Sequence, residues 1–99
     1  MPVLENVVKT KIHEYAEANG CLSLKLNVMG RRGWPDRLFI APGPHVLFME
    51  VKRLGEKPRK LQEYIHNVLR KFGCSVELVD NERDGCTAID RIAAKNQNL

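Results

Sequence analysis

Apolar residues recur along this chain with the two spacings that distinguish helices from strands. Helical spacing predicts one helix over residues 3–18 and a second from Pro58, a favourable first helical residue, to Gly73, a favourable stop. Alternation of apolar and polar residues predicts a strand with one solvent-facing side over Cys21–Val28. The first third of the chain is therefore expected to form a helix followed by a half-buried strand.

Two central stretches, Gly33–Ile40 and His45–Lys52, are apolar on both faces, as expected for strands in the middle of a sheet. The Pro-Gly-Pro sequence between them predicts a hairpin. If the hairpin turns at Gly43, Asp36 lies directly across from Glu50. Opposite side chains are rooted about 5 Å apart, so these two carboxylates would repel each other unless a cation lay between them.

The C-terminal third is predicted to contain a strand over Ser75–Val79, a polar loop over Asp80–Gly85 and a short last helix. Thr87 and Asp90 resemble a capping pair for that helix, which is expected to continue through Ala94. The element order predicts an α/β fold, an α+β arrangement with a mixed sheet and an α-β-β-β-α-β core. A length of 99 residues predicts a single domain.

Composition narrows the class of protein. A net charge of +4 and a pI near 9.2 favour a polyanionic partner. The three cysteines are odd in number and widely spaced, which favours a reducing, cytoplasmic location over a disulfide framework. No apolar run approaches the roughly 18 residues of a membrane span, and no signal peptide pattern opens the chain. We therefore expect an intracellular protein that acts away from membranes.

Glu50 and Lys52 continue a strand face that is otherwise apolar. Burying such charges without partners is costly, so they require either a metal ion or mutual pairing. A simple salt bridge between them is the alternative to a metal site, but it leaves Asp36 unexplained. We therefore favour a site that includes all three residues.

Helical angle directs two more polar side chains toward this site. Glu5 lies roughly 60° from the centre of the first helix's apolar stripe, whereas Glu14 and Glu17 lie roughly 120° and 180° away. A boundary glutamate bonded to solvent is the alternative for Glu5. Gln62 shares the apolar side of the second helix, so we expect it to face the sheet and to find hydrogen-bond partners near Lys52.

Basic residues lie on both sides of the predicted hairpin. They could bind the phosphates of a nucleic acid, or they could simply form solvated surface. The candidates are Arg31 and Arg32 before the hairpin, and Arg53, Lys57, Arg59 and Lys60 after it.

These residues together resemble the PD-(D/E)xK nuclease superfamily, and most closely its VRR-NUC family. The resemblance covers about residues 3–80. Its hallmarks are Gly33-x-Pro35-Asp36, Glu50-x-Lys52, a helical Gln62 and a glutamate on the first helix.

The resemblance implies a metal-dependent structure-specific DNA endonuclease. Asp36, Glu50 and the Val51 carbonyl would hold Mg²⁺ or Mn²⁺, oxygen-seeking cations, and Glu5 would complete the shell. Lys52 would orient or deprotonate the attacking water or stabilise the transition state, with Gln62 positioning a water or Lys52. Small members of the family look like homodimers that cut branched DNA, including four-way (Holliday) junctions. A catalytically silent nucleic-acid-binding module and a small interaction domain are the alternatives.

Overall fold

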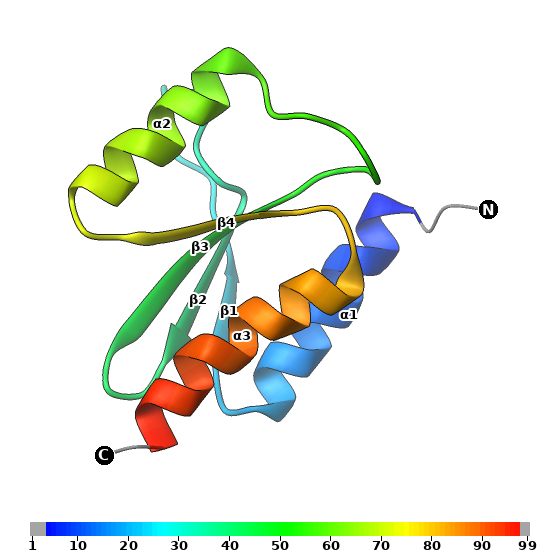
Figure 1. The fold of residues 1–99 in the computed structure, drawn as a ribbon, viewed down its shortest axis with the longest axis vertical. Coiled ribbons are helices and arrows are strands. Elements are labelled where there is room, and N and C mark those ends of the chain that lie inside the picture. The colour runs from blue at the N-terminus through cyan, green and yellow to red at the C-terminus, as the bar shows by residue number, and fades with distance from the viewer. Residues whose placement is uncertain (1–3, 98–99) are drawn as a thin grey trace.

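The computed structural model describes residues 4–97, which form a four-stranded sheet with helices on both of its faces (Figure 1). The mixed α/β fold that the sequence predicts is confirmed. The first residue of the expected N-terminal helix, residue 3, lies outside the described part. In chain order the elements are α1 (Glu5–Ala18), β1 (Leu22–Lys25), β2 (Arg37–Ala41), β3 (His45–Val51), α2 (Lys60–Lys71), β4 (Ser75–Val79) and α3 (Glu82–Gln97).

The sheet has the strand order β1-β2-β3-β4. Strands β1, β2 and β3 run antiparallel to one another, whereas β4 lies parallel to β3 and is reached through α2. In the β2–β3 hairpin Arg37 pairs with Met49, and the turn is centred on Gly43, whose φ is +119°. One step beyond this pair, the same register sets Asp36 opposite Glu50. The predicted pivot of the hairpin is confirmed.

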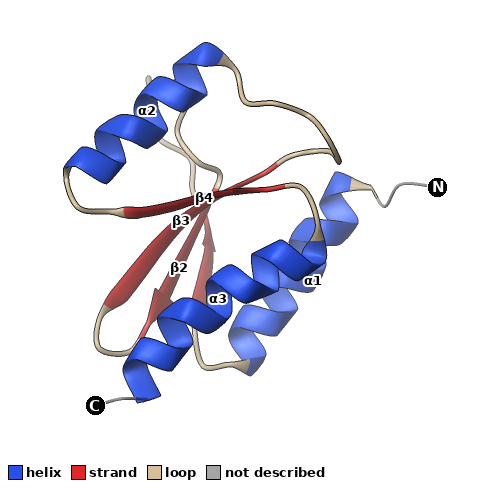
Figure 2. Cartoon of the chain, in the orientation of Figure 1, coloured by secondary structure: helices blue, strands red, loops and turns tan. Residues whose placement is uncertain are grey.

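The hydrophobic core lies between the sheet and the layer formed by α1 and α3 (Figure 2). Ile12 of α1, Phe39 of β2, Met49 of β3 and Ile89 of α3 are all fully buried there. A Cβ atom at Gly85 would collide with the Ile12 side chain, so glycine permits the close approach of α1 and α3. Helix α2 lies on the opposite face of the sheet, where it packs against β4.

Two helix starts differ from the prediction. Helix α2 begins at Lys60, two residues after Pro58. The expected polar loop over 80–85 is wrong, because α3 already begins at Glu82. The Asn81 side chain caps this helix by accepting a 2.8 Å hydrogen bond from the backbone N–H of Asp84. Thr87 and Asp90 therefore lie inside α3 and do not cap its start.

Strand β1 turns its leucines away from the core. Ser23 faces α1, where its hydroxyl lies 2.7 Å from Nδ1 of His13, so Leu22 and Leu24 lie on the other side of the sheet. They are 61% and 46% exposed, because α2 covers only the far part of that face. With their cross-strand partners they form what we call the open apolar face, which comprises Leu22, Leu24, Leu38, Ile40, Val46 and Phe48.

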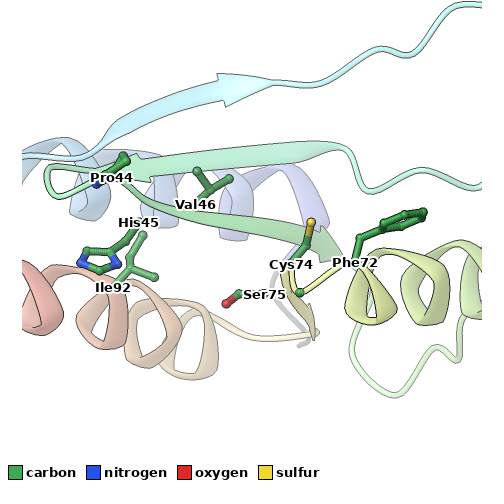
Figure 3. A pocket seen from close by; sticks show the side chains of 8 residues that line it. Pro44, His45, Val46, Phe72, Cys74, Ser75 and Ile92 are labelled. Atoms are coloured by element: carbon green, nitrogen blue, oxygen red, sulfur yellow. The ribbon is translucent and has the colours of Figure 1, made fainter.

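The hairpin end of the sheet carries an open hollow of about 340 Å³. Figure 3 shows Val46 on β3 and Phe72 at the end of α2 on its walls, and Phe72 is 83% exposed. This hollow lies at the opposite end of β3 from Glu50. None of the helices in the described residues is both long and apolar enough to cross a membrane.

Candidate active site

Two carboxylates lie side by side where the β2–β3 hairpin opens. Glu50, on β3, is only 7% exposed, and Asp36, immediately before β2, is half-buried. The Oδ1 atom of Asp36 is buried and has no hydrogen-bond partner within residues 4–97. A buried acceptor without a donor is uncommon in a folded protein and marks a place where a ligand can bind.

The surroundings of Glu50 favour its neutral form. Burial, together with the neighbouring Asp36 carboxylate, raises the pKa of Glu50 to about 7. Lys52 and Lys9 act in the opposite direction and lower this pKa, while Glu5 contributes a smaller increase. A carboxyl group of this kind gives up its proton readily when a cation binds, since the positive charge of the cation stabilises the ionised carboxylate.

Lys9, one turn after Glu5 on α1, is the site residue that the sequence analysis missed. Its Nζ lies 2.7 Å from Oδ2 of Asp36 and 4.0 Å from Oε2 of Glu5. The sequence does contain a signal, because residues four apart share one helix face and Lys9 must therefore point where Glu5 points. An ammonium group thus contacts the carboxylates for which the sequence suggested a metal ion.

Among the three candidate glutamates of α1, the structure brings Glu5 to the site. Glu14 is exposed, and an oxygen of the Glu17 carboxylate lies 3.0 Å from Nε2 of His13. Glu5 occupies the first helical position, and the preceding residue, Leu4, offers no side-chain cap. Its carboxylate is favoured there by the positive end of the helix dipole.

Lys52 is 8% exposed and shares the face of Glu50. Its Nζ forms an ion pair with Oε1 of Glu56, at 3.6 Å, rather than with Glu50. The salt bridge considered as an alternative to a metal site is therefore not formed. Val51 lies between the two charged residues, with its side chain buried in the core on the opposite face.

Gln62 is half-buried, as expected, but its partner differs from the prediction. Its Oε1 accepts a 2.9 Å hydrogen bond from the backbone N–H of Arg59 and so caps the start of α2. No hydrogen bond joins it to Glu50 or Lys52 in the described structure. The exposed N–H groups of a helix's first turn attract any nearby acceptor, and the Gln62 amide meets this local need.

The residues just before Asp36 form a turn that packs against α2. Gly33 has a φ of +86°, and a Cβ atom there would lie 2.8 Å from Cγ of Leu61. The Trp34 ring packs edge-to-face against Phe48, with 6.4 Å between ring centroids. Trp34 therefore packs within the protein.

The predicted phosphate-binding residues all lie on the surface. The loop that carries part of this set leaves β3 next to the carboxylates, and it is attached to the end of β4 by a 3.0 Å hydrogen bond from the Gly55 N–H to Asp80. The predicted residues, all of them exposed, are Arg31, Arg32, Arg53, Lys57, Arg59 and Lys60.

The donor atoms at this site suit a hard divalent cation. They are oxygens, one of them the unpartnered Oδ1 of Asp36. Within residues 4–97 no three acidic, histidine or cysteine side chains are grouped closely enough to form a complete metal site. Mg²⁺ typically binds through one or two carboxylates and takes further ligands from water and substrate phosphate, so a pair of acids is sufficient to begin such a site.

Comparisons with known proteins identify the family of this chain. No family model matches the chain. A protein of Acyrthosiphon pisum secondary endosymbiont phage 1, named "Putative nuclease p44", is 33% identical over 78 residues, which cover 79% of this chain and 83% of the phage protein. A solved structure of a VRR_NUC domain superposes with a TM-score of 0.81 at 36% identity, covering 87% of this chain and 94% of that one. The chain belongs to the VRR-NUC family of nucleases.

Proposed function

We propose that this chain is a divalent-metal-dependent endodeoxyribonuclease that hydrolyses phosphodiester bonds. The observation that carries the proposal is the opposition of Asp36 and Glu50, with the nearly buried Lys52 on the same face. The Asp36 carboxylate contributes to the raised pKa of Glu50, which would be unfavourable in a simple binding surface and becomes useful once a cation lies between the two groups. The family membership supports the class of reaction.

In this proposal Asp36, Glu50 and the backbone carbonyl of Val51 hold Mg²⁺ or Mn²⁺, and Glu5 completes the ligand set directly or through water. The ion supplies Lewis acidity and positive charge to the scissile phosphate. Lys52 donates hydrogen bonds to the attacking water or to the phosphate oxygens, which gain negative charge during the reaction.

Two contacts must change when DNA binds in this way. A phosphate that reaches Lys52 replaces the partly exposed Glu56 carboxylate as the partner of its ammonium group. Gln62 can orient Lys52 or a water only after its amide has released the Arg59 N–H. Each contact has one exposed partner, Glu56 or Arg59, so water can replace the interaction that this partner loses.

We propose branched DNA, including four-way junctions, as the substrate, and a homodimer as the active form. The exposed basic residues on either side of the carboxylates support binding to a phosphate backbone. The open apolar face supports a second copy, since it leaves large side chains uncovered. A two-fold symmetric dimer would place two identical sites for paired cuts. The scattered cysteines favour a cytoplasmic location.

The test is a cleavage assay with labelled single-stranded, duplex, flap and four-way-junction DNA, each with Mg²⁺, Mn²⁺ or EDTA. We expect metal-dependent cutting that falls by about 10²–10³-fold in Asp36→Asn and Lys52→Met. Glu14→Gln serves as the matched control, because Glu14 is an exposed acid on α1 remote from the site, and its rate should equal the wild-type rate.

Each alternative has its own result in this assay. Cutting that persists in EDTA, or that survives both site substitutions, contradicts the proposed chemistry. Tight DNA binding with no cutting in either metal supports a catalytically silent binding module. Equal cutting of duplex and junction DNA retains the nuclease and removes the preference for branches.

A further inference from the structure

Lys9 contacts the candidate metal ligands without being needed for the fold's core. Its side chain is 25% exposed and lies on the edge of α1, where its Nζ contacts the carboxylates of Asp36 and Glu5. Lys9 also lowers the pKa of Glu50. A single ammonium group therefore acts on carboxylates from α1, from the start of β2 and from β3.

The contact with Asp36 competes with a metal ion at the atomic level. The 2.7 Å ion pair occupies Oδ2 of Asp36, while Oδ1 of the same carboxylate is buried without a partner. A divalent cation that binds this carboxylate meets a positive charge a few ångströms away. Two cations at such a distance repel strongly in a partly buried site, so they cannot both bind Asp36 without loss.

The side chain of Lys9 is also able to move away from Asp36. Its ammonium group is carried by a flexible four-carbon stem, and the partial exposure of the side chain provides a path to solvent. The backbone of α1 need not move, because the buried Val8 and Ile12 hold the helix against the core.

We propose that Lys9 is the resident cation of this site: it holds Asp36 and Glu5 together in the metal-free protein and competes with the divalent cation, so that its displacement sets the metal affinity. This inference rests on the proposed function, since it assumes that the metal binds Asp36. It makes Lys9 a positioning residue, because it acts through Asp36 and need not touch the reacting atoms.

The test is calorimetric titration of the full chain with Mn²⁺ in the absence of DNA. Replacing Lys9 with methionine keeps the stem and removes the charge. We expect Lys9→Met to bind Mn²⁺ about tenfold more tightly than wild type. The wild type must break one charge-assisted hydrogen bond, between Lys9 and Asp36, before the metal binds, and the variant has no such bond to break. Lys9→Arg, which keeps the charge, should remain near the wild-type affinity.

Lys11→Met is the matched control, since it removes one positive charge from the same helix at an exposed position. Its Mn²⁺ affinity should stay within about threefold of wild type, as expected for a screened surface charge. In EDTA, Lys9→Met should melt at a lower temperature than Lys11→Met, and Mn²⁺ should reverse the order. Lys9→Gln repeats the measurement if Lys9→Met does not fold without metal.

The outcomes separate this inference from the proposed function. If Mn²⁺ binding is lost in Asp36→Asn but Lys9→Met binds no more tightly than Lys11→Met, the role of Lys9 is wrong and the metal site stands. Weaker binding by Lys9→Met and Lys9→Gln also overturns it. If Asp36→Asn binds Mn²⁺ as well as wild type, the proposed metal site is wrong and this inference fails with it.

Discussion

At the scale of single residues, the site is governed by charges that the fold forces together. Burial and Asp36 oppose the ionisation of Glu50, and two lysines favour it, with the net result that the pKa of Glu50 rises to about 7. The protonation of this one carboxyl group therefore changes across the physiological range. Its ionised form destabilises the metal-free protein, and a bound cation would turn the same charge into a ligand.

This linkage predicts a pH-dependent effect of Glu50→Gln on stability in EDTA. Between the ordinary pKa near 4.5 and the folded value of about 7, the unfolded chain releases a proton that the folded chain retains. Wild-type stability therefore loses a contribution as the pH rises through this window. We expect Glu50→Gln to be more stable than wild type by roughly 2 kcal/mol at pH 8 and about equal to it at pH 4.

Urea unfolding at the two pH values measures the difference. Glu14→Gln is the control, because this exposed acid should give the same small effect at pH 4 and pH 8. An equal effect of Glu50→Gln at both pH values would show that Glu50 ionises normally in the folded chain.

At the scale of elements, features that depend on neighbouring residues can be predicted from the sequence. Features that depend on packing between distant elements cannot. The Pro-Gly-Pro turn and the apolar strands on either side were enough to predict the hairpin register, since both are local properties. The start of α3 was missed because Gly85 suggests a loop, and only the approach of Ile12 explains a glycine inside a helix. The alternation in β1 predicted a strand, but which side meets the core depends on where α1 and α2 pack.

The same distinction between local and long-range features explains which residues of the site can be predicted from the sequence. The facing pair of Asp36 and Glu50 follows from counting along one hairpin. The face that Lys9 shares with Glu5 directs it toward the sheet, but its contact with Asp36 depends on how the start of α1 meets the sheet's end, which no local pattern specifies. Gln62 was assigned to the site by its helical angle, but angle does not reveal that the Arg59 N–H lies closer.

The turn before Asp36 makes a prediction about α2. Gly33→Ala adds a Cβ within 2.8 Å of Cγ of Leu61 at a φ of +86°. Gly30→Ala is the control, because Gly30 has a similar φ of +73° and open space around it. We expect Gly30→Ala to cost about 1 kcal/mol from the backbone alone and Gly33→Ala about 2–3 kcal/mol.

Thermal unfolding of the two variants would check this. Equal losses would show that the contact between Gly33 and α2 relaxes freely. A larger loss in Gly33→Ala accompanied by reduced cleavage would connect the seating of α2 to the placement of Asp36.

At the scale of the whole molecule, the helices cover the sheet unequally. Two helices close one face, and α2 closes only part of the other (Figure 1). The open apolar face is left uncovered, and Val46, one of its residues, also lines the hollow at the hairpin end (Figure 3). A chain of 99 residues buries a limited share of its own apolar surface. The exposed leucines of β1 are therefore the surface through which we expect two copies to associate.

This association makes a prediction for Leu24→Glu. Leu24 is 46% exposed, so a charge there is tolerated in a monomer but is buried without a partner in a dimer that uses this face. We expect sedimentation velocity to show a dimer for wild type and a monomer for the variant, with unchanged circular dichroism. Met29→Glu, at a residue that is 90% exposed in a loop, should remain dimeric. A wild-type monomer, or a dimeric Leu24→Glu, would contradict the prediction.

The uncapped start of α1 affects how quickly Glu5 moves toward and away from the other carboxylates. Its first turn holds Glu5 and has no side-chain cap, so the N–H groups of Glu5 and Asn6 depend on water, whereas the Val7 N–H donates a 3.0 Å hydrogen bond to the Leu4 carbonyl. Hydrogen exchange at Glu5 and Asn6 should therefore be fast, while Ile12, buried in the core, exchanges only on global unfolding. Helix ends open and close within about a microsecond. Glu5 would thus join and leave the other carboxylates many times during a single turnover.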